Sequence, residues 1–182
     1  MVLEDDRDGL VSLAFNPHGS ILATGGGGSP EVLQQPTGKD SPHAERARPV
    51  RLWDAKTGSP LRLLTGHMGS IHALVFTPEG TRLISAGADR LIRVWDTADG
   101  CLLQTLEGHS KPVYSLALGQ DGRQLASAGA DGSIKIWELS EGRLIRSLTG
   151  HTNWIFGLAF HPDGTRIASR GRWHRASLGD WR

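Results

Sequence analysis

The sequence has a single cysteine, almost no net charge and no long apolar run. Cys101 is the only cysteine among 182 residues, which excludes an intrachain disulfide framework and favours a reducing compartment. Twenty Lys and Arg against 19 Asp and Glu give a net charge of +1, which offers no overall field to attract nucleic acid or an anionic membrane. No apolar run reaches the roughly 20 residues of a membrane span. We expect a cytoplasmic protein without a membrane segment.

A tandem repeat dominates what the sequence does contain. Three Gly-His pairs recur at intervals of 42 residues, and Trp-Asp or Trp-Glu pairs recur at the same interval. These pairs are Gly66-His67, Gly108-His109, Gly150-His151, Trp53-Asp54, Trp95-Asp96 and Trp137-Glu138. Such regularity means that one supersecondary unit has been copied, so each residue has to be interpreted against its copies.

One period predicts a four-stranded antiparallel meander. Residues 71–76, 82–85, 91–95 and 102–106 are short β-type runs with turn signals such as Thr77-Pro78-Glu79-Gly80 between them. Leu74 and Phe76 lie among apolar residues on both faces, so a lone sheet would be unstable. Radial stacking of such sheets buries both faces and leaves only short edges.

The order Gly-His, four strands, Trp-Asp resembles the WD-repeat (Trp-Asp repeat) β-propeller family over about residues 9–169. The resemblance implies an all-β fold with about three full blades plus half a blade. Blade 1 would cover about 9–65 with a loop insertion at about 26–48, blade 2 about 67–107 and blade 3 about 109–149. An incomplete blade 4 would cover about 151–169, followed by an aberrant tail at 170–182.

Each complete blade repeats a polar set at offsets of 18, 22 and 28 residues from the histidine. The sets are His67, Ser85, Asp89, Trp95 and His109, Ser127, Asp131, Trp137. Serine, histidine and aspartate together suggest a nucleophilic triad, but catalysis gives no reason to duplicate it in successive blades. An indole donating to serine, serine bonded to histidine and histidine bonded to aspartate would satisfy every group. In the family that the chain resembles, these positions form a structural tetrad, so we expect no catalytic, cofactor-binding or metal-binding residues.

The first copy departs from the pattern. Thr24 takes the serine position, and Asp6 replaces the histidine. The insertion contains the run Gly25-Gly26-Gly27-Gly28, but it lacks the Gly-Lys-Ser/Thr half of a phosphate-binding loop. A surface loop is the expected structure, and no cofactor is expected.

The fourth copy departs after Ser169. Trp173 stands where an aspartate is expected, and Gly179 where the tryptophan is expected. With permissible codons, a frame shifted by one base can encode Gly-Ala-Asp-Gly-Thr-Val-Arg-Leu-Trp here, which is the missing third strand. We hypothesise a one-base frameshift that truncates a longer array. Because propellers close with about four to eight blades, we also expect self-association through open blade edges.

Function is predicted where equivalent surface positions vary. In related propellers the narrow face at the entry to each first strand is the usual docking surface, which here carries His72, Tyr114, Trp154 and Phe156. We expect the last three aromatics to lie close together and to bind a protein or peptide. The alternative is that Trp154 and Phe156 only cover the channel or pack on a neighbouring blade.

The leading hypothesis is a non-catalytic scaffold for protein–protein interaction. The alternative is a truncated or frameshifted fragment of a larger regulatory protein, whose propeller serves a kinase or NTPase domain. Nucleic-acid binding is not expected, because Arg82, Arg93 and Lys135 are dispersed among acids and read as solvated strand faces.

Overall fold

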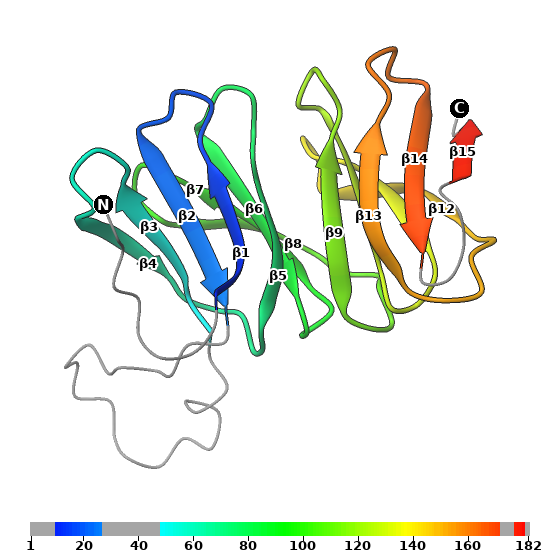
Figure 1. The fold of residues 1–182 in the computed structure, drawn as a ribbon, viewed down its shortest axis with the longest axis horizontal. Helices are drawn as coiled ribbons and strands as arrows, with labels where there is room; N and C mark the ends of the chain where they lie inside the picture. The colour runs from blue at the N-terminus through cyan, green and yellow to red at the C-terminus, as the bar shows by residue number, and fades with distance from the viewer. Residues whose placement is uncertain (1–9, 27–47, 172–176, 181–182) are drawn as a thin grey trace.

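The computed structural model describes residues 10–26, 48–171 and 177–180, and within these ranges the chain is all-β, with its strands in four antiparallel sheets (Figure 1). The first sheet contains β1 (Leu10–Phe15), β2 (Ile21–Gly26), β3 (Val50–Asp54) and β4 (Pro60–Leu64). The second contains β5 (Ile71–Phe76), β6 (Arg82–Gly87), β7 (Ile92–Asp96) and β8 (Leu102–Leu106). The third contains β9 (Val113–Leu118), β10 (Gln124–Gly129), β11 (Ile134–Glu138) and β12 (Arg143–Leu148). The fourth contains β13 (Ile155–Phe160), β14 (Arg166–Gly171) and β15 (Ser177–Asp180). No described segment forms a helix able to cross a membrane.

Each sheet is a meander in which consecutive strands pair, as the repeat predicts. Turn residues make this possible. Gly80 adopts a φ of +72° and donates its N–H to the carbonyl of Thr77 at 2.8 Å, which closes the turn between β5 and β6. After β7, the carboxylate of Asp96 accepts the N–H of Ala98 at 2.7 Å. The aspartate of the Trp-Asp pair therefore holds the turn that leads to the last strand.

Three apolar clusters join the four sheets in chain order. Between the first two sheets, Leu52 and Leu64 pack with Phe76 and Trp95. The next two clusters have the same character, and their members are Ile84, Ala86, Ile92, Val94, Leu106, Val113, Leu125, Trp137 and Leu139, and then Ala126, Ala128, Ile134, Ile136, Ile155 and Ile167. Figure 1 shows the sheets side by side, from the β1 sheet on the left to the β13 sheet on the right. The predicted partial β-propeller is confirmed.

The fourth sheet extends beyond the end expected at residue 169. Strand β14 continues to Gly171, and β15 pairs with it inside the segment predicted as an aberrant tail. Gly179 lies opposite Ile167, the place that Trp95 takes opposite Leu83 in the second sheet. Backbone groups alone make the ladder, so the strand forms without the expected side chains. Asp6, Trp173 and nearly all of the 26–48 insertion lie outside the described residues.

Candidate functional site

The polar set of the second sheet converges in one chain of hydrogen bonds. Trp95 Nε1 donates to Ser85 Oγ at 2.8 Å, and Ser85 Oγ lies 2.7 Å from His67 Nε2. His67 Nδ1 lies 2.9 Å from Asp89 Oδ2. The structure therefore links the loop before β5, strand β6, the turn after β6 and strand β7 through four side chains.

The third sheet repeats this arrangement. Trp137 Nε1 donates to Ser127 Oγ at 2.8 Å, and Ser127 Oγ lies 2.8 Å from His109 Nε2. His109 Nδ1 lies 2.8 Å from Asp131 Oδ2. The two histidines, the two serines and the two tryptophans are buried.

The aspartate of each set also holds the backbone around it. Asp131 accepts the N–H of Ser110 at 3.1 Å from the loop before β9, and the N–H of Ser133 at 3.0 Å from its own turn. Burial alone would raise the pKa of Asp131, but the hydrogen bonds from Ser133 and His109 outweigh it and keep the pKa below its usual value. The carboxylate therefore stays charged at neutral pH and ties two loops together.

The glycine before His109 has a packing reason. At Gly108, a Cβ would lie 3.1 Å from the ring of Trp137, which is closer than most Cβ contacts. Glycine lets the backbone pass over the indole and deliver His109 to the serine. The Gly-His pair and the Trp-Asp pair are thus two parts of one contact.

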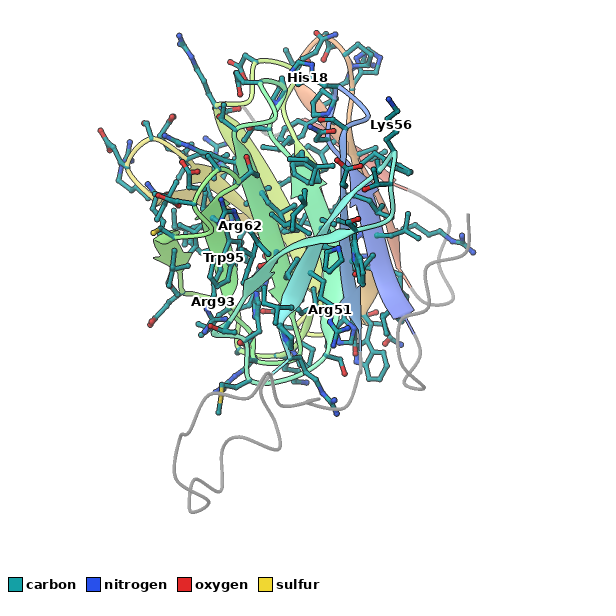
Figure 2. All side chains as sticks on the ribbon, turned by 90° about the vertical axis from the view of Figure 1, so that its left-hand side faces the viewer. His18, Arg51, Lys56, Arg62, Arg93 and Trp95 are labelled. Carbon is teal, nitrogen blue, oxygen red and sulfur yellow. The ribbon has the colours of Figure 1, made fainter. Side chains whose placement is uncertain are left out.

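The prediction that Arg93 lies on a solvated strand face is wrong. The side chain is buried, and its Nη1 lies 2.7 Å from both Asp89 Oδ2 and His67 Nδ1. Figure 2 shows Arg93 beside Trp95 on the second sheet. Burial by itself would raise the pKa of Asp89, but the neighbouring His67 and Arg93 lower it well below its usual range. A buried cation is retained here because the carboxylate neutralises it.

The first and fourth sheets carry partial versions of the set. Trp53 Nε1 donates to Thr24 Oγ1 at 2.9 Å in the first sheet. In the fourth, His151 Nε2 lies 2.7 Å from Ser169 Oγ. Each partial set still joins two elements of its sheet.

The serines of the full sets are placed for packing rather than for reaction with a substrate. Ser85 and Ser127 are fully buried, and each hydroxyl already contacts an indole and an imidazole. A substrate carbonyl has no access to either oxygen in this structure. Among the described residues, no three His, Cys, Asp or Glu side chains converge as they would around a metal ion.

A second repeated feature lies at the start of the first strand of every sheet, which is β1, β5, β9 or β13. We call these four the inner strands. A shift in register leaves one residue without a cross-strand partner at the same position in each sheet. These residues are Val11, His72, Tyr114 and Phe156. Such bulges turn a side chain out of the regular alternation of the strand. The bulges therefore place equivalent side chains in a row across neighbouring sheets.

Three of the four bulge residues, His72, Tyr114 and Phe156, form an aromatic cluster with Trp154. The rings of His72 and Tyr114 have centroids 5.1 Å apart, and those of Tyr114 and Phe156 are stacked at 5.1 Å. Trp154 lies 5.8 Å from Tyr114 and 6.0 Å edge-on from Phe156. The structure brings together all four residues predicted to bind a partner. We call His72, Tyr114, Trp154 and Phe156 the aromatic row.

The aromatic row remains accessible although its members contact one another. Trp154 is 38% exposed and Phe156 48% exposed, while His72 and Tyr114 are half-buried. Burial lowers the pKa of His72, so its ring is neutral at pH 7 and stacks without a charge. A pocket of about 150 Å³ adjoins Trp154 and is lined by Lys111 and Asn153 among others. The row thus combines apolar surface with nearby polar groups.

Two further residues of this region escaped sequence reasoning. Val11 is the first member of the bulge series, and an offset of 61 residues from His72 identifies it. Arg90 has a φ of +71° where the equivalent residue of the third sheet is Gly132, with a φ of +73°. Comparison of the copies could have flagged Arg90, because a large residue replaces glycine at a left-handed position.

Stacked four-stranded sheets, each holding an internal Trp–Ser/Thr contact, define the β-propeller class of repeat proteins. The chain matches the family described as "WD domain, G-beta repeat" over residues 1–29, 58–96, 100–138 and 142–175. The chain belongs to this family of WD repeat proteins. No curated protein gives a match. WD repeats support a general role as a protein-interaction scaffold.

Proposed function

We propose that the chain is a non-catalytic scaffold that binds a protein or peptide through the aromatic row. The observation that carries the proposal is the ring cluster of Tyr114, Trp154 and Phe156 on the adjacent third and fourth sheets, in which Tyr114 stacks on Phe156 while Trp154 and Phe156 are exposed. Aromatic side chains are frequent anchors at interfaces, because they bury a large area and lose little conformational freedom.

The preorganised state of the row supports binding rather than simple packing. Tyr114 is held between His72 and Phe156, so a ligand would meet rings that are already ordered. Preorganisation lowers the entropy cost of association. The neighbouring pocket with Lys111 offers a cation for an acidic group beside the apolar anchor. We expect an extended segment that carries an aromatic or aliphatic residue.

A peptide library displayed on phage is the probe that tests this proposal. Peptides selected on the wild-type chain should lose about tenfold or more in affinity for Tyr114→Ala and Phe156→Ala, since interface hot spots cost about 2 kcal/mol or more. Leu144→Ala, an exposed apolar residue on β12, is the matched control and should bind normally. Failure to enrich any peptide, or equal binding by all variants, would count against the row as a docking site.

The fragment hypothesis remains a second proposal of a different kind. The observation that favours it is Gly179 at the tryptophan position of a third strand that nevertheless pairs in register. Here the propeller would serve a kinase or NTPase domain of a larger regulatory protein. Sequencing the gene on both sides tests this, and the absence of further repeats or such a domain in every frame would refute it.

A further inference from the structure

The first sheet exposes apolar side chains on the face that points away from the second sheet. Leu13 is 63% exposed and Phe15 57% exposed. The preceding residue, Ser12, faces the second sheet, where its hydroxyl donates to the carbonyl of Ile71 at 3.1 Å. Leu13 and Phe15 therefore lie on the opposite face.

The other sheets show what covers such residues. The equivalent pairs are Leu74 and Phe76, Leu116 and Leu118, and Leu158 and Phe160. Each pair packs in the apolar cluster shared with the preceding sheet, and Phe76 is only 7% exposed as a result. Inside the molecule, such a pair of large side chains therefore always packs against the sheet that precedes it.

The far face of the fourth sheet offers a matching surface. In the third sheet, Ala117 and Ala126 pack in the cluster that receives Leu158 and Phe160. Forty-two residues later the same positions hold Ala159, which is exposed, and Ala168, which is partly exposed. The alanine pair that receives two large side chains inside the molecule is therefore repeated on its surface.

We propose that two copies of this chain associate head to tail, with Leu13 and Phe15 of each copy packed on Ala159 and Ala168 of the other. Both contacts repeat the internal interface between the third and fourth sheets. Two copies of four sheets close a ring of eight, within the range of about four to eight blades found in propellers. The second copy is the occupant because it carries both halves of the required match.

Sedimentation equilibrium of the intact chain tests the proposal. We expect a mass of twice the 19.6 kDa of one chain. Leu13→Asp and Ala159→Arg each place a charge in both contacts of the ring, so each variant alone should be a monomer. Leu144→Asp changes an exposed leucine on β12 in the same way and should remain a dimer. All substituted side chains are exposed, so far-UV circular dichroism should be unchanged.

Mixing the two interface variants separates the head-to-tail contact from a symmetric one. Leu13→Asp keeps an intact alanine face, and Ala159→Arg keeps an intact leucine face. Neither variant should dimerise by itself, but an equimolar mixture of the two should form a dimer through the one contact that joins the two intact faces. A dimer of Ala159→Arg by itself would show that two first sheets pack together and would overturn the proposal. A monomeric wild type, which leaves the face to another blade or protein, or an open-ended oligomer would overturn it as well.

Discussion

At the scale of single residues, the Ser–His–Asp set repeated in the second and third sheets is a network of hydrogen bonds that holds each of these two sheets together. Every polar atom of His109 faces a partner, Ser127 at one ring nitrogen and Asp131 at the other. In the low dielectric of a buried site such bonds are strong, and an orphaned partner is costly. Histidine is therefore hard to replace at this position for structural reasons alone.

His109→Ala should lower the free energy of unfolding by about 1–3 kcal/mol, because Ser127 and Asp131 lose their common partner. His18→Ala removes an exposed histidine and should change it by less than about 0.5 kcal/mol. Urea titration followed by tryptophan fluorescence measures both. Equal stability of the two variants would refute the role assigned to His109.

His72 should make the protein less stable in mild acid. Burial lowers its pKa in the fold below the usual 6.5, so the folded state favours the neutral ring. This contribution is fully present above the unfolded pKa of about 6.5 and is lost as pH falls through the folded pKa. His72→Gln should therefore lose less stability than the wild type between about pH 7 and pH 5. Parallel losses in urea titrations at these pH values would contradict the prediction.

At the scale of elements, the bulges at the start of β5 and β9 depend on close backbone contacts. Ala130 N donates to the carbonyl of Pro112 at 2.8 Å just beyond Gly129. A Cβ at Gly129 would lie 2.0 Å from that carbonyl oxygen, and Gly87 has the same relation to Ser70. Glycine at the end of the second strand therefore fixes where the first strand begins and where Tyr114 points.

Gly129→Ala should destabilise the protein by about 2 kcal/mol or more, since the first strand must move to admit the methyl group. It should also broaden or shift the aromatic NMR signals of Tyr114, whose position depends on this contact. Gly157→Ala is the control, because its nearest neighbour would be an ordinary 3.7 Å from the new Cβ. A stable Gly129→Ala with an unchanged spectrum would contradict this account.

Most of these elements could be predicted from the sequence, and the exceptions have physical reasons. The strands and the two polar sets follow from strict periodicity, and the aromatic row follows from aligning the copies. Arg93 escaped because a lone arginine in a β-strand usually faces solvent, and only the carboxylate of Asp89 makes its burial favourable. Strand β15 escaped because its side chains lack the pattern, whereas its backbone still pairs.

At the scale of the whole molecule, the same kind of interface occurs three times between successive sheets. The outer faces of the first and fourth sheets would form it again in the proposed dimer. Large residues of one sheet pack on small or branched residues of the sheet before it. Because the interfaces between successive sheets are alike, the stack places the aromatic row across the second, third and fourth sheets. The stack is therefore the support, and the row is the proposed site of function.

The most direct test of this division is the affinity of one peptide, selected on the wild-type chain, for Phe156→Ala and Ser127→Ala. Phe156 is exposed in the aromatic row, whereas Ser127 lies buried in a polar set. The account predicts that Phe156→Ala weakens binding about tenfold or more, while folded Ser127→Ala binds like the wild type. Loss of binding in Ser127→Ala with full affinity in Phe156→Ala would contradict it.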